Sequence, residues 1–399
     1  MKNASAGTKP SQRSFNIVAL TNLVLLMTGV LATPLYRIYG ADFNLTSVDL
    51  TVIYAAYAIA VVPTLFIFGP IGDKIGRKRV LITSVAIALV SSVVFAAGSG
   101  FIWLIVGRAL QGIAVGAASG NATAAMVELE TSGNRRRASQ IAGTSLFAGL
   151  AVGPLLSGFT AEYLPLPTLL VFVVDFAVLT IVLGLLFTVK EPGQWPRAEK
   201  FRMRRPSIPA NIRIPFGSAT LSAGLVFAMS GLYFSVAPAY TEALLNTSNV
   251  LVGGAVTSVM VTVSIVTQRV LRGVQARKLL ITGQLSLSLG LALMVLAHTA
   301  ASVEVLVLGA VISGFAYGAT FLGAVAIVNA VSPENRRGDI TSTFYALTYL
   351  ALGVPIIGLG FAAQVLNLFE AVQFFVAAIV AIALVHVAWI LLRGHAISD

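Results

Sequence analysis

Charged residues are scarce in this sequence. Asp, Glu, Lys and Arg make up 10% of its 399 residues, whereas a soluble domain usually carries about 25%. Because 57% of the residues are apolar, the chain cannot cover a water-facing surface, which excludes a soluble enzyme or nucleic-acid-binding protein. Cysteine is absent, so disulfides and thiolate metal sites are excluded. The histidines (His298, His386, His395) have no metal-site spacing, and we expect neither a metal nor a cofactor.

Long apolar runs are abundant instead. A helix of about 20 residues crosses a hydrocarbon core of about 30 Å, and twelve segments suit that role. Their approximate limits are 14–38, 48–72, 80–98, 101–125, 138–162, 166–189, 214–240, 250–268, 279–297, 303–330, 340–365 and 370–392. The first segment is long enough to span, so we interpret it as a helix and not as a removable signal peptide.

The longest polar connection, residues 190–213, is basic and contains proline, and it divides the segments six and six. This pattern predicts an all-α membrane protein of twelve transmembrane helices. We expect an N-terminal six-helix bundle over residues 1–189, a cytoplasmic linker over 190–213 and a C-terminal six-helix bundle over 214–399.

The net charge of +11 is unevenly distributed. If the N-terminus is cytoplasmic, every Lys and Arg except Arg37 and Arg108 falls in a cytoplasmic segment. Such enrichment is the usual orientation signal of membrane proteins. We therefore predict that both termini are cytoplasmic and that the positive charge does not bind nucleic acid. The short loops suggest a bacterial inner membrane.

The two halves of the sequence repeat each other at an offset near 200 residues. The matching features are Arg135–Arg136 with Arg336–Arg337, Pro154 with Pro355, and Gly112 and Gly116 with Gly314 and Gly318. Parallel six-helix halves related by an axis along the membrane normal are a transporter architecture, with the substrate site near the midplane between the halves. Rocking of the halves would expose that site to each side in turn.

The loop after the second segment reads GPIGDKIGRKR over residues 69–79. Gly72 and Gly76 permit a tight turn, and Asp73 can face the positive end of a neighbouring helix. The loop closely resembles the signature loop of the major facilitator superfamily, which implies that Asp73 faces the helix beginning near Asp339. A plain basic topology loop is the alternative. The gate that the resemblance implies comprises Gly69, Asp73, Gly76, Arg77, Glu128 and Glu130, with Arg77 paired to an acid.

Two charged residues lie deep within predicted spans, Arg108 in the fourth and Asp175 in the sixth. An intramembrane arginine costs about 2.5–3.5 kcal/mol on insertion scales, so it should face a partner or a wet cavity. The run over 107–112 resembles the superfamily's second motif, whose arginine is associated with proton transfer. We predict Arg108 and Asp175 as proton-coupling residues. The alternative for each is a purely structural partnership, since the sixth helix of this fold is usually peripheral.

Residues 149–158 read GLAVGPLLSG. Small residues let membrane helices approach closely and proline bends a helix, so ordinary packing would explain them. The run also resembles the antiporter motif of drug:proton antiporters, with Ser157 in place of a glycine, and this resemblance favours export. The first segment, however, lacks the acid that many drug:proton antiporters place there. The motif residues are Gly149, Gly153, Pro154 and Gly158.

The resemblance implies a central cavity with aromatic walls and few polar groups, which suits amphipathic ligands. Tyrosine also collects at membrane interfaces, which is the alternative for any single tyrosine. If Arg108 and Arg37 face the cavity without acids, a neutral or anionic substrate is as plausible as a cation. The predicted substrate-binding residues are Asn22, Tyr36, Arg37, Tyr57, Arg108, Gln111, Tyr233, Phe315, Asn329 and Tyr349.

Together these features predict a monomeric secondary active transporter that exports a small amphipathic compound or drug in exchange for protons. Its expected partners are the substrate, protons and the lipid bilayer. One alternative is an exporter of a specific metabolite, such as a siderophore, a sugar or an amino-acid derivative. A second is a membrane receptor or scaffold that transports nothing. We do not expect an enzyme, because no catalytic groups converge at one depth.

Overall fold

The computed structural model describes residues 11–191, 208–236, 238, 240–241, 249–333 and 336–393, and all regular structure within them is helical. Twelve stretches are long and apolar enough to cross a membrane, which confirms the predicted fold class. In the first half they are α1 with its extension α2 (Gln12–Asp42), α3 (Ser47–Ile75), α4 (Arg77–Ala96), α5 (Phe101–Leu129), α6 (Arg135–Tyr163) and α7 (Pro167–Thr188). In the second half they are α8 (Arg213–Ser235), α10 (Val250–Val270), α11 (Ala276–Thr299), α12 (Val303–Val331), α13 (Arg337–Val365) and α14 (Leu368–Leu392).

Several helices are longer than the apolar segments that predicted them. At 1.5 Å per residue, the 29 residues of α6 extend about 44 Å, beyond a hydrocarbon core of about 30 Å. A helix is the natural form within the core because it satisfies its own backbone hydrogen bonds. The added turns carry polar residues such as Arg135 and Arg337 at the helix ends.

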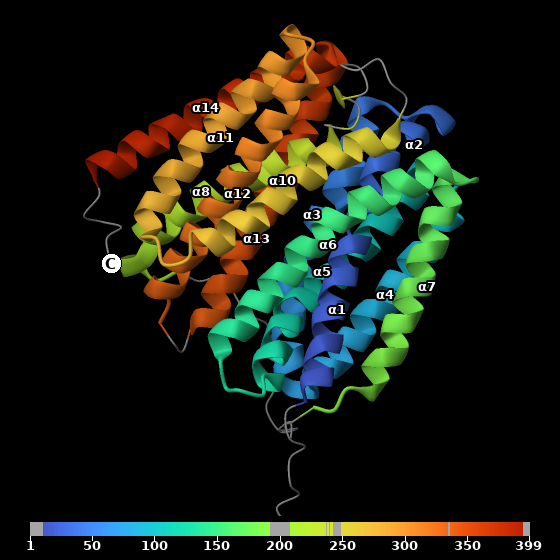
Figure 1. Ribbon diagram of the computed structural model, residues 1–399, viewed down its shortest axis with the longest axis vertical. Coiled ribbons are helices and arrows are strands. Elements are labelled where there is room, and N and C mark those ends of the chain that lie inside the picture. Colours follow the sequence, from blue (N-terminus) through green and yellow to red (C-terminus); the bar gives the residue numbers. More distant parts are fainter. Residues whose placement is uncertain are drawn as a thin grey trace, which may run out of the picture.

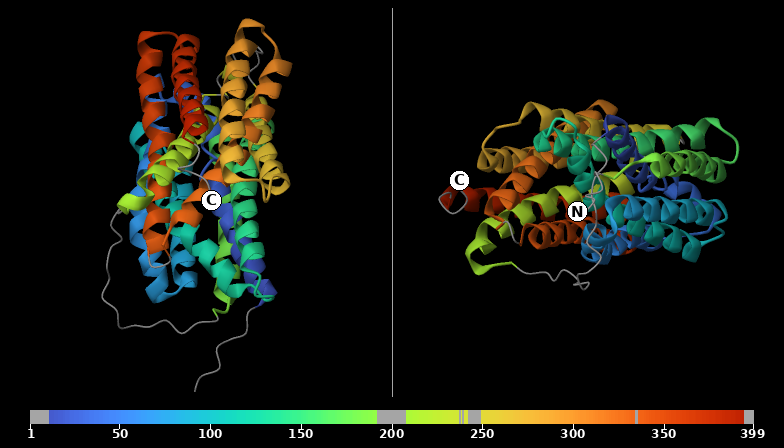
Figure 2. Two further views of the ribbon diagram at one scale, coloured as in Figure 1. Left: turned by 90° about the vertical axis from the view of Figure 1, so that its left-hand side faces the viewer. Right: turned by 90° about the horizontal axis from the view of Figure 1, so that it is seen from below.

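The helices form two halves that lie side by side (Figure 1). Figure 1 shows α1 to α7, in blue to green, in one half, and α8 to α14, in yellow-green to red, in the other. In a view turned by 90° the long helices of both halves appear upright (Figure 2), whereas Figure 1 shows α14 and α7 inclined to each other. The halves meet along α3 against α13 and α6 against α10. Residues 192–207 of the predicted linker lie outside the described residues.

The internal repeat extends to individual packing contacts. A Cβ atom on Gly112 of α5 would lie 2.3 Å from the carbonyl oxygen of Tyr57 in α3. A Cβ atom on Gly314 of α12 would lie 2.3 Å from the carbonyl oxygen of Met260 in α10. Only glycine fits at either position, so the same helix pair is held by the same contact in each half.

The first span is interrupted, which the sequence reading missed. Helix α1 ends at Thr28, and a short 3-10 helix, η1 (Thr33–Leu35), precedes α2 (Tyr36–Asp42). The interruption frees the carbonyl oxygens of Gly29 and Leu31, which in lipid must find other donors. Arg108 Nη1 donates to Gly29 O at 2.7 Å, and Ser157 Oγ donates to Leu31 O at 2.6 Å.

Candidate substrate pathway and coupling site

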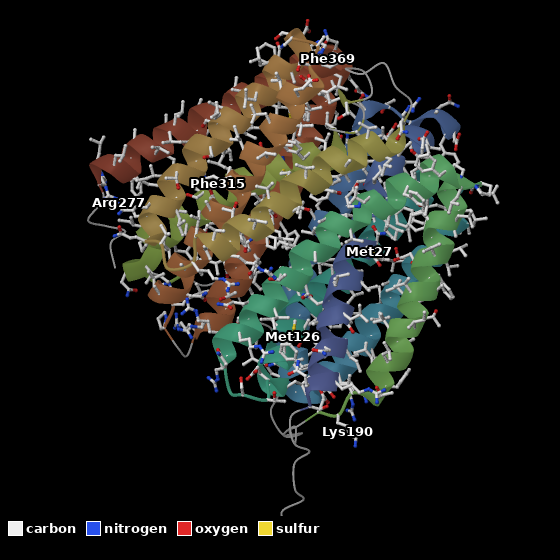
Figure 3. The ribbon with its side chains drawn as sticks, viewed as in Figure 1. Met27, Met126, Lys190, Arg277, Phe315 and Phe369 are labelled. Carbon is white, nitrogen blue, oxygen red and sulfur yellow. The ribbon has the colours of Figure 1, made fainter. Side chains whose placement is uncertain are left out.

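One end of the molecule is basic. Nitrogen-bearing side chains gather there, and Lys190 and Arg277 mark it in the two halves (Figure 3). A hollow of about 440 Å³, here called the vestibule, lies at this end between α6, α10 and α12. No acid occurs among the described residues that line it: Arg136, Ser139, Gln140, Gly143, Thr144, Phe147, Ile265, Gln268, Arg269, Arg272, Leu322, Val325, Ala326 and Asn329.

The halves are in contact at the opposite end. The N–H of Val250, which begins α10, donates to Glu162 near the end of α6 at 3.0 Å. A Cβ atom on Gly360 of α13 would lie 1.9 Å from Thr51 Oγ1 of α3. The pathway between the halves is therefore open towards the basic end and sealed at the other.

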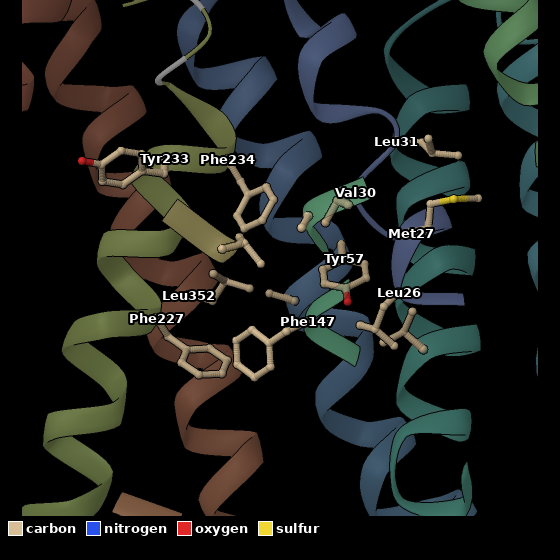
Figure 4. Packing of buried hydrophobic residues seen from close by; sticks show 14 of the residues in the cluster. Leu26, Met27, Val30, Leu31, Tyr57, Phe147, Phe227, Tyr233, Phe234 and Leu352 are labelled. Atoms are coloured by element: carbon tan, nitrogen blue, oxygen red, sulfur yellow. The ribbon is translucent and has the colours of Figure 1, made fainter. Parts of the chain in front are cut away.

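Aromatic rings meet at mid-length of the helices, above the vestibule. The rings of Phe147 and Tyr317 are 5.5 Å apart and those of Tyr57 and Tyr349 are 6.3 Å apart, so both pairs join the two halves. Figure 4 shows Phe147 and Phe227 facing each other between the helices of the two halves. We call this set the aromatic cluster: Tyr57, Phe147, Phe227, Tyr317, Phe321, Tyr345 and Tyr349.

Arg108 lies behind Tyr57 and is 1% exposed. Its Nη1 donates to Gly29 O at 2.7 Å and to Gln111 Oε1 at 2.8 Å, and its guanidinium carbon is 4.8 Å from the centre of the Tyr57 ring. No carboxylate of the described residues pairs with it. Three buried donors in this region have no hydrogen-bond partner among the described residues: Arg108 Nε, Gln111 Nε2 and Tyr36 Oη.

Asp175 of α7 is fully buried inside the N-terminal half. Its Oδ1 accepts a hydrogen bond from Thr28 Oγ1 at 2.7 Å, and its Oδ2 accepts one from Ser92 Oγ at 2.6 Å. Both of these partners are neutral hydroxyl groups. Asp175 does not contact Arg108, but Thr28 directly precedes Gly29, whose carbonyl oxygen binds Arg108.

The loop between α3 and α4 brings together most of the predicted gate. Arg77 forms an ion pair with Asp73, and its Nε lies 3.4 Å from Glu128 Oε1, as predicted. Gly76 has a φ of 99°, which only glycine adopts readily. Arg77 also donates to Asn121 Oδ1 at 2.9 Å. Asn121, a polar residue within the fourth span, was missed by the sequence reading.

Glu130 does not join this group and instead holds the loop between α5 and α6. It accepts hydrogen bonds from Ser132 Oγ and the N–H of Asn134, both at 2.7 Å, and pairs with Arg137 at 3.3 Å. The Ser132 hydroxyl, then the Asn134 N–H and the charge of Arg137, lower the pKa of this carboxyl below its ordinary value. Gly69 lies within α3, away from the turn at Gly76.

The residues of the antiporter motif pack α6 tightly. A Cβ atom on Gly149 would lie 2.2 Å from Leu23 O, and one on Gly153 would lie 2.8 Å from Met27 O, so both glycines hold α6 against α1. Gly158 faces α10 of the other half instead. Pro154 lies inside α6, and Gly254 of α10 packs against its carbonyl oxygen.

Four predicted substrate-binding residues lie away from the pathway. Asn22 donates to Ala142 O at 3.0 Å and pins α1 to α6, and Arg37 is exposed on α2. Tyr233 is buried and points away from Tyr57 and Phe147 (Figure 4). Phe315 is two residues from Tyr317, which puts it on the opposite side of α12. Phe321 lies one helical turn from Tyr317 on α12. Helix periodicity counted from Tyr317 therefore predicts Phe321, and not Phe315, on the side of the pathway.

A model of the Major Facilitator Superfamily matches residues 18–275 of the chain. Among curated proteins, the quinolone resistance protein NorA of Staphylococcus aureus is 27% identical over 142 residues, which is 35% of this chain and 37% of that protein. An uncharacterised transporter of the superfamily from Mycobacterium tuberculosis is 31% identical over 157 residues, or 39% of this chain and 23% of that protein. Each match thus spans well under half of the relative's length.

Solved structures match over nearly the whole chain. A bacterial homologue of the human lysosomal transporter Spinster, in an inward-facing and occupied conformation, has a TM-score of 0.75 at 16% identity and covers 98% of both chains. A D-xylose–proton symporter has a TM-score of 0.71 at 15% identity, covering 94% of this chain and 96% of its own. At these identities the likeness concerns the fold alone.

Proposed function

Because the chain belongs to the Major Facilitator Superfamily, we propose that it exports a small amphipathic compound in exchange for protons, by alternating access. Membership makes it an integral membrane transporter and not an enzyme. The observation that carries the proposal is the one-sided closure of the pathway, with a vestibule at the basic end and contact between the halves at the other. If the closed end opens while the open end closes, the same site is exposed to each side of the membrane in turn.

The basic end is the cytoplasmic end in this proposal, because Lys and Arg are enriched on the cytoplasmic side of membrane proteins. Both termini are then cytoplasmic, the protein is a monomer of a bacterial inner membrane, and residues 190–213 join its two bundles. The vestibule faces the cytoplasm in this arrangement. An exporter loads its substrate in that state.

Export is supported by two observations. The glycines and proline of the antiporter motif fit α6 closely against both α1 and α10, and such a seam limits leakage of protons or substrate while the halves move. A relative over about a third of the chain is named for quinolone resistance, which is consistent with drug efflux.

Asp175 is the proposed proton carrier. Its carboxyl group is buried in the membrane-spanning part, and hydroxyl groups can serve it in either protonation state, because they donate to a carboxylate and accept from a carboxylic acid. Its neighbour Thr28 ends α1 directly before the Gly29 carbonyl that holds Arg108. A change of charge at Asp175 is therefore connected to Arg108 by two hydrogen bonds and the peptide bond between Thr28 and Gly29.

Asp73 and Arg77 are the proposed gate. In the present state both are engaged within the N-terminal half, and we propose that Asp73 faces the start of α13 when the cytoplasmic ends close. Replacing Asp73 with Asn should slow transport at least several-fold with little loss of folded protein, measured as flux per purified molecule. Unchanged flux would remove Asp73 from the gate.

Flux in proteoliposomes tests the whole proposal. Purified protein is reconstituted, a pH gradient is imposed, and movement of a chemically diverse panel of compounds is followed with and without an ionophore that collapses the gradient. Proton-dependent movement of several compounds supports drug export, and movement of one compound supports a metabolite exporter. Absence of flux for the whole panel would favour a receptor or scaffold.

A further inference from the structure

The described pathway is rich in positive charge. The vestibule is lined by Arg136, Arg269 and Arg272. Arg108 lies behind Tyr57 of the aromatic cluster. None of these four arginines forms an ion pair with a described carboxylate. Asp175, which is buried in α7, accepts hydrogen bonds from Thr28 and Ser92 and pairs with none of these arginines. A cationic substrate would enter this pathway against a repulsive field, and an anionic one would be attracted.

Arg108 is a charge without a counter-ion. A buried ion is stable only when it is paired and its hydrogen-bonding groups are satisfied. Both hydrogen bonds of this guanidinium leave from Nη1, towards Gly29 O and Gln111 Oε1. On the other edge, Nε is buried without a partner among the described residues, and both hydrogen bonds of the guanidinium to described residues leave from Nη1 and none from Nη2. That edge offers two parallel N–H donors and matches the two oxygens of a carboxylate.

The unpartnered donors around Arg108 support the same reading. Gln111 Nε2 and Tyr36 Oη are buried without a hydrogen-bond partner in the described structure, and Tyr36 lies within electrostatic range of the guanidinium. A buried donor without a partner costs about 1–3 kcal/mol, and here three occur together. A carboxylate can accept a hydrogen bond from each of these three donors, whereas an ammonium group can accept none.

We propose that Arg108, Gln111 and Tyr36 form a carboxylate-binding subsite, and that the transported substrate is an aromatic or otherwise apolar carboxylate. The apolar part of the substrate lies in the aromatic cluster. Tyr57 links the two regions, since its ring contacts both Arg108 and the Tyr349 ring of the other half. Displacement of Tyr57 lets the carboxylate reach Arg108, and the vestibule arginines attract the anion to the entrance. This inference rests on the proposed transport pathway but not on proton coupling.

The test compares one ligand skeleton in three charge states. Equilibrium dialysis with purified full-length protein measures binding of 1-naphthylacetate, its neutral amide and 1-naphthylethylammonium, and of the same three forms of a longer phenylalkyl chain. We expect the dissociation constants of the two carboxylates to be at least 10-fold lower than those of the corresponding amides. The two ammonium compounds should have the highest dissociation constants. Equal or tighter binding of amides or ammonium forms would overturn the proposal, and so would failure of both carboxylates to bind.

Gln111→Glu gives the decisive variant, because it supplies a carboxylate to Arg108 from within the protein. Gln111 Oε1 already lies 2.8 Å from Arg108 Nη1, so the isosteric acid fits and the fold should be kept. We expect the affinity for the carboxylates to fall at least 10-fold and that for the amides to stay within about 2-fold. Gln373→Glu, an exposed site on α14, adds the same charge and should change neither. A purely structural Arg108 would leave the carboxylate-to-amide ratio unaltered in Gln111→Glu.

Transport assays separate this inference from the proposed function. Proton-driven export of ammonium compounds, with no preference for carboxylates, would refute the carboxylate subsite and leave proton-coupled export standing. Carboxylate binding that depends on Gln111, without any effect of a pH gradient on flux, would support the subsite and refute proton coupling.

Discussion

At the scale of single residues, Asp175 and Arg108 are both buried charges with different surroundings. Asp175 is enclosed by two hydroxyl groups within one half. Arg108 lies against the aromatic cluster that joins the halves, and its Nε donor has no partner among the described residues. We therefore propose Asp175 for the proton and Arg108 for the substrate, which keeps one of the two roles that the sequence predicts for Arg108.

Asp175→Asn should abolish proton-driven uphill flux while ligand binding is retained. Asparagine has nearly the same shape, and the hydroxyl groups of Thr28 and Ser92 can donate to its oxygen and accept from its nitrogen, so the fold should persist. Flux driven by a pH gradient and downhill exchange are measured in the same vesicles. Asp42→Asn, at an exposed position, is the control. Normal uphill transport by the Asp175 variant would exclude it as an essential proton carrier.

The loop held by Glu130 should loosen in acid. The pKa of this carboxyl is lower in the folded chain than its ordinary value of about 4.3. Its stabilising effect is therefore complete above that ordinary value and is lost as pH falls through the lower folded-state pKa. Hydrogen exchange over residues 130–137, corrected for the intrinsic pH dependence, should become faster in that range.

Glu130→Gln provides the matching comparison at neutral pH. At pH 7 the amide hydrogens of this loop should exchange as fast in the variant as they do in the wild-type protein in acid. The reason is that Ser132 and Asn134 then donate to a neutral amide and not to a carboxylate. Exchange that is equally slow in both proteins at pH 7 would mean that the charge of Glu130 does not hold the loop.

At the scale of helices, α1 and α6 depend on each other. The interruption of α1 leaves carbonyl oxygens that α5 and α6 satisfy through Arg108 and Ser157. Glycines of α6 in turn let its backbone approach α1. The antiporter motif therefore seals an irregular helix, which gives its small residues a reason beyond general membrane packing.

Gly149→Ala should destabilise the protein by about 1–3 kcal/mol, the usual cost of overpacking. The added methyl group would lie 2.2 Å from the backbone oxygen of Leu23, which cannot move without shifting α1. Gly184→Ala in α7 is the control, because nothing lies within 4 Å of its added Cβ and alanine favours a helix by up to about 1 kcal/mol. Thermal unfolding in detergent should show a lower midpoint for the first variant only. An unfolding midpoint of Gly149→Ala equal to that of Gly184→Ala would contradict the close contact between α6 and the backbone of α1 at Gly149.

At the scale of the whole molecule, the described parts of the two halves are in contact at the end opposite the basic one. At that end, Gly360 of α13 packs against Thr51 of α3, with 2.9 Å between an added Cβ and that of Thr51. In alternating access this contact must open once in each cycle. The chain has no cysteine, so an introduced pair can be cross-linked without background.

The double variant Thr51→Cys with Gly360→Cys should form a disulfide after a slight separation, since the usual Cβ distance is about 3.5–4.5 Å. Oxidation should lower flux to background, and a reducing agent should restore it. Thr51→Cys alone should transport under both conditions. Full flux in the cross-linked protein would show that the halves do not separate at this end.

The twelve spans, the repeat and the tight turn after the second span follow from the amino-acid sequence alone. Long apolar runs have few stable forms in lipid other than helices, and a repeated pattern of Gly and Pro imposes the same packing twice. Motif residues close in sequence, such as Asp73 and Arg77, need only one local turn to meet.

Which polar groups lie close together follows instead from the packing of the helices in three dimensions. The break in α1, the enclosure of Asp175, and the removal of Asn22, Arg37, Tyr233 and Phe315 from the pathway depend on how helices far apart in sequence are rotated and placed. Hydropathy reports that a residue lies in a helix within the membrane. It carries no record of which side of that helix faces lipid, a neighbouring helix or the space between the halves, because in lipid all three surroundings accept apolar side chains.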